Sequence, residues 1–149
     1  LLINHHWKLI PAIEDIDRNS YGTIAYGLSI TLMLIFLWPQ NAPAVCAGVL
    51  VMACGDGMAG LIGSHIKSPN WRILGQRKSL AGTSTMAFIT FIILISLKIV
   101  IQAPLNLASI FLITAIAVGL EQIGLWGSDN VTVPISVAFG WLWLTNSLN

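Results

Sequence analysis

The sequence ACGDGMAGLIGSHIKSPNWRILGQRKSLAGT, residues 53–83, is the stretch around which the rest of the chain can be interpreted. It places one acid, Asp56, between two glycines in an otherwise apolar segment, and most of the chain's basic residues follow it closely. An ionisable side chain inside a segment that resembles a bilayer helix is costly in lipid. Asp56 is therefore the first candidate functional residue.

The composition predicts an integral membrane protein. Of the 149 residues, 56% are hydrophobic and 9% are charged, and the mean hydropathy is +0.81. So few charges cannot cover a water-soluble domain of this size. The seven basic and six acidic residues nearly cancel, and we expect no nucleic acid partner. Cys46 and Cys54 share one apolar segment, so we expect small buried side chains rather than a disulfide.

Apolar runs predict an all-α fold, a polytopic transmembrane helix bundle of about five spans. Residues 1–20 are expected to form a polar N-terminal segment on the cytoplasmic side, and residues 21–149 the transmembrane domain. Because the chain begins without methionine or a signal-peptide pattern, we expect that upstream helices of a longer protein are absent. The sequence does not indicate an oligomeric state. The expected spans are 21–38, 43–65, 80–101, 105–125 and 131–143.

Basic residues predict the orientation of these spans. The link between the second and third spans is rich in positive charge, which favours the cytoplasmic side. Counting crossings from this link places Asp56, Glu121 and the neighbours Asp129 and Asn130 near that same face. Acids from three parts of the chain are therefore expected to converge beside the basic link. The basic residues of the link are Lys67, Arg72, Arg77 and Lys78.

Small residues accompany Asp56 along its helix. Gly60 and Gly63 share its face by the three-and-four spacing of an α-helix and would leave room beside the acid. The alternative is that Gly55, Ala59 and Gly63 form a seam for helix packing, with the acid only hydrogen-bonded inside the bundle. A packing seam does not require an aspartate, so we favour a functional role for Asp56.

The residue types at this face suit phosphate chemistry. Carboxylate and amide oxygens are hard ligands for Mg²⁺, which binds through one or two carboxylates together with substrate phosphates. The candidate ligands are Asp56, Asp129 and Asn130. Arg77 and Lys78 would neutralise a polyphosphate. Together these features predict transfer of a phosphate-containing group between a soluble nucleotide and a lipid held among the helices.

A helix rich in hydroxyl groups is expected to begin directly after Lys78, where free backbone N–H groups can receive phosphate oxygens. The run GQRKS (75–79) superficially resembles a phosphate-binding loop, but arginine rather than glycine precedes the lysine, so it is not a P-loop. Trp71 is expected at the membrane interface, with stacking on a nucleotide base as the alternative. The expected phosphate-binding residues are Arg77, Lys78, Ser79, Gly82 and Thr83.

Five separated motifs follow one another along the chain: GDGMAGLIG (55–63), a link with Trp71, GQRKSLAGTSTMAF (75–88), Glu121 and SDNVTVP (128–134), after the entry RNSYGTIAYG (18–27). In this order they resemble the polyprenol kinase family, which includes phytol, farnesol and dolichol kinases and is related to CTP-dependent diacylglycerol kinase. The resemblance implies a membrane enzyme that transfers the terminal phosphate of CTP, or of another nucleotide, to an isoprenoid alcohol. Residues 21–149 would then be its kinase domain, with a lipid alcohol, a nucleotide and the bilayer as partners.

The resemblance also implies roles for single residues. Asp56 matches the aspartate of the family's GD motif, and Lys78 matches the lysine of its KS-G motif, with Ser79 and Gly82 beside it. We expect Lys78 to neutralise phosphate, and Asp56 or Glu121 to orient or deprotonate the alcohol. The family leaves open which carboxylate binds metal and which accepts the proton. The DN-VP motif, expected to help hold Mg²⁺ through its first two residues, is Asp129, Asn130, Val133 and Pro134.

Two other functions use similar residue types. A phosphatidate cytidylyltransferase also acts on CTP at a membrane but forms a diphosphate-linked liponucleotide and releases pyrophosphate. A small transporter would place acids and broken helices near the membrane midplane. We find no internal repeat of the spans, and the acids gather toward one face, so the kinase interpretation is preferred to the transporter.

Overall fold

The computed structural model describes residues 21–125 and 127–148. Most of them lie in helices, and one pair of short strands interrupts the helical order. The segments α3, η2 (a π-helix) and α4 follow one another without a break and form one rod, Ala42–His65. The elements in chain order are α2 (Tyr21–Leu37), α3 (Ala42–Leu50), η2 (Val51–Asp56), α4 (Gly57–His65), β1 (Asn70–Ile73), β2 (Gln76–Ser79), α5 (Leu80–Ile101), α6 (Leu107–Ile123) and α7 (Asp129–Leu148).

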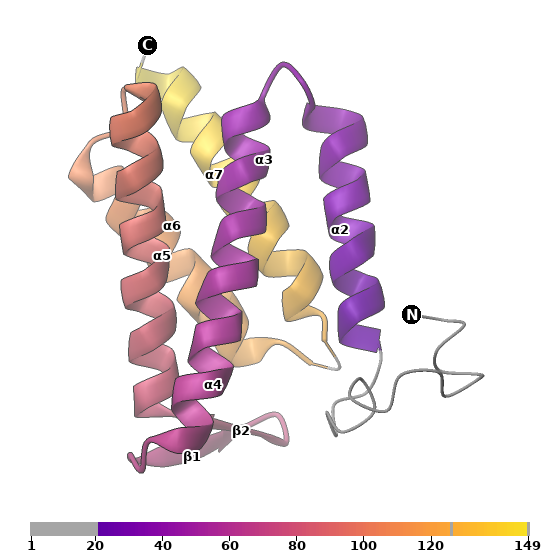
Figure 1. Ribbon diagram of the computed structural model, residues 1–149, viewed down its shortest axis with the longest axis vertical. Helices are drawn as coiled ribbons and strands as arrows, with labels where there is room; N and C mark the ends of the chain where they lie inside the picture. The colour runs from indigo at the N-terminus through magenta and orange to yellow at the C-terminus, as the bar shows by residue number, and fades with distance from the viewer. Residues whose placement is uncertain (1–20, 126, 149) are drawn as a thin grey trace.

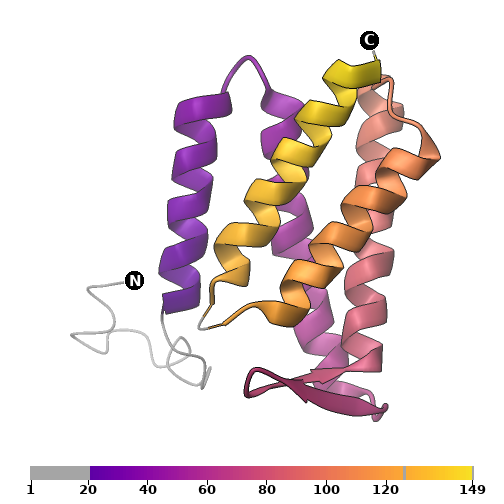
Figure 2. The ribbon, with the colours of Figure 1, turned by 180° about the vertical axis from the view of Figure 1, so that it is seen from behind.

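The helices run side by side along the long axis of the molecule, and the two strands lie at one end (Figure 1). α7 packs against α2, α3 and α6, whereas α5 packs against α4, η2 and α6. Figure 2, from behind, shows α6 and α7 crossing in front of the other helices. The fully buried apolar side chains between them include Val51, Met86, Leu94, Ile110, Ile113, Val133 and Val137.

The prediction of a helical bundle is confirmed for the described residues, but the number of membrane crossings is not. In the part of the chain that the structure describes, two helices are long and apolar enough to cross a membrane, Ala42–His65 and Leu80–Ile101. The apolar helices Gly22–Leu37 and Leu107–Ile123 are shorter. Five crossings therefore stay a prediction. The expected N-terminal segment, 1–20, lies outside the described residues.

The basic link is a short β-hairpin rather than the expected loop, and it is an addition to an otherwise helical fold. β1 and β2 are antiparallel, with Trp71 opposite Lys78 and Arg72 opposite Arg77. The two residues between the strands, Leu74 and Gly75, both have positive φ, 50° and 84°. Two-residue hairpin loops favour this conformation because its twist matches that of the strands, and glycine adopts it without steric cost.

The last helix begins earlier than expected. The predicted span was 131–143, with Asp129 and Asn130 in the preceding link, but both residues belong to the first turn of α7. The carbonyl of Ser128 accepts hydrogen bonds from the N–H groups of Val131 and Thr132, at 3.0 and 2.9 Å, and so begins the helix. A carboxylate in the first turn is also favoured by the helix dipole.

Small residues allow α4 and α5 to approach closely. A Cβ atom on Gly63 would lie 2.8 Å from Ser79 Oγ and 3.2 Å from Gly82 Cα, and one on Gly55 would lie 2.8 Å from Met86 Sδ. Ala59 is buried against the same helix, since its carbonyl would lie 3.0 Å from a Cβ on Gly82. The seam of small residues considered as an alternative is therefore present.

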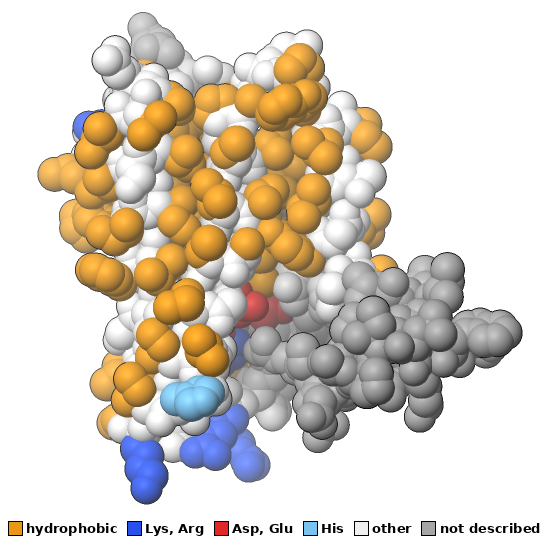
Figure 3. All heavy atoms as spheres, viewed as in Figure 1, with side chains coloured by type: hydrophobic (Ala, Val, Ile, Leu, Met, Phe, Trp, Pro, Cys, Tyr) orange, Lys and Arg blue, Asp and Glu red, His pale blue; other side chains and the backbone are white. Residues whose placement is uncertain are grey.

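Apolar side chains cover the outside of the helices, and charge gathers at the hairpin end (Figure 3). Large hydrophobic residues such as Phe36 on α2, and Phe88 and Val100 on α5, are exposed. Cys46 and Cys54 are also exposed, so the expectation of buried cysteines is wrong, although both are free thiols as expected. These helices are apolar nearly all round, which is why hydrophobicity alone did not indicate their buried faces.

The seam gives a stability prediction. We expect Gly63→Ala to destabilise the fold by about 1–3 kcal/mol, because the added methyl must displace Ser79 and the α5 backbone. Thermal unfolding in detergent measures the effect. The matched control is Gly57→Ala in the same helix, where nothing lies within 4 Å of the new Cβ. Equal melting temperatures for the two variants would show that the seam is not closely packed.

Candidate functional site

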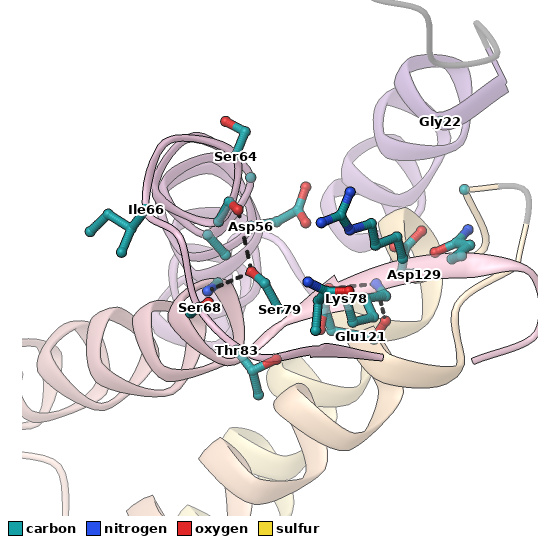
Figure 4. Close-up of a pocket in the computed structure, with 18 of the residues that line it drawn as sticks. Gly22, Asp56, Ser64, Ile66, Ser68, Lys78, Ser79, Thr83, Glu121 and Asp129 are labelled. Atoms are coloured by element: carbon teal, nitrogen blue, oxygen red, sulfur yellow. Dashed lines mark hydrogen bonds and ion pairs between the residues drawn. The ribbon is translucent and has the colours of Figure 1, made fainter. Parts of the chain in front are cut away.

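A cavity of about 950 Å³ opens at the hairpin end of the bundle. It lies among α4, the hairpin, the first turn of α5, the end of α6 and the beginning of α7, and the first turn of α2 borders it. The structure brings all nine of the predicted site residues to this one cavity (Figure 4). They are Asp56, Arg77, Lys78, Ser79, Gly82, Thr83, Glu121, Asp129 and Asn130.

Asp56 stands at the junction between the π segment and α4. The preceding residue, Gly55, is buried against Met86 of α5, whereas Asp56 is half-buried and lines the cavity together with Gly60 and Gly63. Figure 4 shows its carboxylate directed away from the helix into the cavity. This rod therefore carries both the packing seam and the face that lines the cavity. The π segment is notable here because π turns are frequent at functional sites.

Lys78 and Glu121 form a buried ion pair. Lys78 Nζ lies 2.5 Å from Glu121 Oε1 and donates a second hydrogen bond, of 2.7 Å, to the backbone carbonyl of Glu121. The two residues are 7% and 8% exposed. Because side chains alternate along a strand, Lys78 shares a hairpin face with its cross-strand partner Trp71, and this face meets the end of α6. The pair ties the hairpin to the bundle.

Gln122 was not singled out from the sequence, although it contacts several site residues. Its Nε2 donates to Glu121 Oε2 at 2.7 Å, so both oxygens of that carboxylate are hydrogen-bonded. Its Oε1 accepts from the indole N–H of Trp71 at 3.1 Å. Trp71 therefore has a defined partner in the bundle, a contact that neither interface location nor base stacking anticipated. The only sequence signal was a polar residue beside Glu121 in an apolar helix.

The first backbone N–H groups of α5 are not free, contrary to the sequence-based expectation. Leu80 N donates to the carbonyl of Pro69 at 2.9 Å, Ala81 N to Ser68 Oγ at 3.1 Å, and Gly82 N to Ser79 Oγ at 3.2 Å. Ser79 acts as the N-cap of the helix. Phosphate binding by the side chains that line the cavity stays a prediction.

Asp129 and Asn130 enter the cavity from the beginning of α7. Asp129 is 5% exposed, and its Oδ1 accepts a 3.1 Å hydrogen bond from the backbone N–H of Asn130. Gly124 makes room for it, since a Cβ there would lie 2.5 Å from Asp129 Cβ. Gly127, with φ 83°, lets the chain turn directly against Gly22 of α2. The two glycines thus fix the position of the carboxylate.

The DN-VP spacing has a physical reason. A proline has no N–H, so Pro134 cannot donate the helical hydrogen bond to the carbonyl of residue 130. Pro134 is buried, and α3 approaches its carbonyl closely at Gly48, where a Cβ would lie within contact distance of that oxygen. The motif therefore places Pro134 at a tight contact between α7 and α3, and it places the side-chain oxygens of Asp129 and Asn130 at the cavity.

The oxygen donors at the cavity fit a magnesium ion that binds together with its substrate. Within residues 21–125 and 127–148, no group of three or more His, Cys, Asp or Glu side chains forms a complete metal site. Mg²⁺ usually uses one or two carboxylates and completes its shell with phosphates and water. Asp56, Asp129 and Asn130 line one cavity and are donors of that kind.

The fold and the cavity define a class of protein: an apolar helical bundle with a cavity at one end that is lined by acidic and basic side chains (Figure 3). Comparison with known proteins makes this more specific. The chain is 34% identical over 154 aligned positions to a phytol kinase from Synechocystis sp.. The alignment covers 96% of the chain and 65% of the length of that relative. This similarity confirms the resemblance to the polyprenol kinase family.

The other comparisons were negative. No family model matches the chain. No solved structure matches it either.

The ion pair gives a second prediction. We expect Lys78→Met to destabilise the fold by about 3–5 kcal/mol, because it leaves the Glu121 carboxylate buried without its cation. Adding Glu121→Gln should recover part of this loss, since the second change removes the orphaned charge. Thermal unfolding of the single and double variants measures the coupling. Lys98→Met, at the other end of α5, is the control and should change little. Simple additivity of the two site variants would contradict a coupled pair.

Proposed function

We propose that this chain is the catalytic part of a membrane-embedded lipid kinase that transfers the terminal phosphate of CTP to an isoprenoid alcohol such as phytol. The observation that carries the proposal is that acids and cations from four separate motifs line one cavity. Similarity to a phytol kinase supports the reaction class and the alcohol acceptor. Since the chain spans 65% of that relative, the activity is proposed for the protein that contains it.

The exposed apolar surface supports membrane embedding. In the two candidate spans, only 39% and 17% of the most apolar window is buried inside the bundle. The helices of a soluble core would be mostly buried, and large contiguous apolar surfaces on soluble proteins are rare. The cavity lies at the end of the bundle (Figure 3). A lipid alcohol whose chain lies among the helices would therefore place its hydroxyl group in the cavity. The basic hairpin is proposed to face the cytoplasm.

Two cations are suited to the nucleotide phosphates. Lys78 lines the cavity from β2 and has three N–H donors, two of which reach acceptors of Glu121. Arg77 is exposed and borders the same cavity. The guanidinium group offers bidentate hydrogen bonds to phosphate oxygens. We assign both residues to the polyphosphate of CTP, where they stabilise charge that develops during transfer.

Asp56 is the better candidate for the carboxylate that orients and deprotonates the alcohol. Glu121 is buried and both of its carboxylate oxygens are held by Lys78 and Gln122, whereas Asp56 is half-buried and directs its carboxylate into the cavity (Figure 4). In the proposed step, the alcohol oxygen attacks the terminal phosphorus of CTP. The bond from that phosphorus to the bridging oxygen breaks, the alcohol proton passes to Asp56, and CDP leaves.

Asp129 and Asn130 are proposed to hold Mg²⁺ when nucleotide binds. Their oxygen atoms are ligands of the type that this ion prefers, and Asp129 is fixed by its contact with Gly124. The ion would neutralise charge on the phosphates and orient the transferred group. Asp56, from the facing helix, completes the set of acidic groups around the reacting atoms.

The first test is a product assay. Membranes expressing the full-length gene receive CTP labelled in its terminal phosphate, Mg²⁺, and separately phytol, farnesol, dolichol or diacylglycerol. We expect label in the monophosphate of one isoprenoid alcohol. Asp56→Asn, which keeps the size of the side chain, should reduce transfer by about 100-fold or more, as expected for loss of a general base.

The alternative functions give different products in the same assay. Without label in any lipid, the terminal phosphate is not being transferred and the kinase proposal fails. CTP labelled in its first phosphate, supplied with phosphatidate, then tests cytidylyltransfer, because a labelled liponucleotide forms only in that reaction. No product in either experiment would favour the transporter.

The metal assignment predicts a separable effect. Asp129→Asn should raise the Mg²⁺ concentration needed for half-maximal transfer by about tenfold, which corresponds to about 1.4 kcal/mol of binding free energy. The KM for the alcohol should stay unchanged, because the alcohol is assigned to Asp56. A Mg²⁺ titration of initial rates measures the shift. Unchanged metal dependence would remove Asp129 from the metal site.

A further inference from the structure

Gln122 connects three separate elements at the cavity. From α6 it donates to Thr83 Oγ1 of α5 at 2.9 Å and accepts from the indole N–H of Trp71 in β1 at 3.1 Å. It also donates to the neighbouring Glu121 carboxylate at 2.7 Å. Thr83 lies 39 positions and Trp71 lies 51 positions from Gln122 in the chain, whereas Glu121 is its direct neighbour.

The chemistry of the partners fixes the orientation of the Gln122 amide. An indole N–H can only donate and an ionised carboxylate can only accept, so the amide oxygen must face Trp71 and the NH₂ group must face Glu121. The second hydrogen of the NH₂ group is satisfied by Thr83. A rotated amide would place oxygen against the carboxylate and NH₂ against the indole. Gln122 therefore has one stable orientation.

This orientation determines where Lys78 points. Since Gln122 holds Glu121 Oε2, the other oxygen, Oε1, is presented to the Lys78 ammonium group. Two N–H groups of Lys78 are directed to acceptors of Glu121, and the residue borders the cavity. Its third N–H is the one that can reach a phosphate oxygen. If Gln122 did not hold the carboxylate, both the carboxylate and the ammonium group could turn together.

We propose that Gln122, anchored by Trp71 and Thr83, is a positioning residue that fixes Glu121 and through it directs the Lys78 ammonium group to the nucleotide phosphates. The proposal rests on the proposed kinase function for the identity of the nucleotide. Gln122 is not among the residues that line the cavity, so it acts through its neighbours. The hairpin is the part of the fold that brings this set together, because Trp71 and Lys78 are cross-strand partners.

The test compares the two substrates of the reaction. Gln122→Met keeps a similar length and volume but removes all three hydrogen bonds. We expect the KM for CTP to rise about 10- to 100-fold, the range for losing a hydrogen bond to a charged group. The KM for phytol should stay within about twofold, because the alcohol is bound elsewhere.

Milder variants test the two anchors separately. Thr83→Val and Trp71→Phe each remove one partner of Gln122 and should raise the KM for CTP in the same direction, by less than Gln122→Met. Thr85→Val is the matched control for threonine, since the Thr85 hydroxyl donates to the carbonyl of Ala81 in its own helix. Trp143→Phe, at an exposed tryptophan of α7, is the control for the aromatic change. Neither control should alter the KM for CTP.

The outcomes distinguish positioning from a purely structural role. An unchanged KM for CTP in Gln122→Met, or an equal loss in the kcat/KM of both substrates together with a lower melting temperature, would overturn the proposal. If Gln122→Met does not fold, Trp71→Phe decides, because it replaces the indole with a smaller aromatic ring that has no N–H donor.

If the wild-type protein transfers no phosphate, the kinase proposal fails, and binding of CTP with Mg²⁺ is measured by thermal stabilisation instead. Weaker stabilisation by CTP in Gln122→Met than in wild type would still support the positioning role. Equal stabilisation, or the absence of any stabilisation in wild type, would overturn it.

Discussion

The buried pair between Lys78 and Glu121 is the interaction on which the candidate site depends. Two charges removed from water are costly unless they compensate each other and their remaining hydrogen-bonding groups have partners. Here Glu121 receives hydrogen bonds on both carboxylate oxygens, and its backbone carbonyl accepts a second bond from Lys78. Such a pair specifies geometry more than it adds stability. It determines that the hairpin lies against the end of α6 rather than projecting away from the bundle.

The rod Ala42–His65 both packs against α5 and lines the cavity, and its sequence did not indicate which small residues belong to which role. Gly55 packs against α5, Asp56 lines the cavity, and Gly63 does both. Small residues were interpreted as either a packing seam or as space around an acid, and the structure contains both. A helix can do this because neighbouring positions in the sequence point in different directions around its axis.

Local patterns in the sequence predicted much of the site. The position of Asp56 in an apolar run, the basic residues after it and the polar DN pair near the end indicated one charged face, and the structure places these residues around one cavity. Hydropathy also indicated the helical rods, since long apolar runs with polar links have few other solutions. What these residues do in the reaction stays a proposal.

The features that sequence patterns missed depend on contacts between distant residues or on backbone geometry. Gln122 has no distinctive local pattern, and its partners Trp71 and Thr83 lie on other elements. The hairpin is so short that its alternation is hidden among basic residues, although Gly75 marked its turn. The N–H groups at the start of α5 were expected to be free because the residues that bond them, Ser68 and Pro69, precede the strands.

The π segment Val51–Asp56 has a consequence for how relatives of this chain should be aligned. A π turn contains one residue more than an α turn, so it is equivalent to an insertion that the helix absorbs without a loop. An α-helix rotates by about 100° per residue. A relative with one residue fewer in this segment would therefore keep a continuous helix. The part of the rod that follows the deletion, including the acid, would be rotated about the helix axis relative to α5. An alignment gap between residues 51 and 56 therefore corresponds to a rotation of the helix that follows it. An alignment that moves the gap into the neighbouring link would pair residues that face different sides of the bundle.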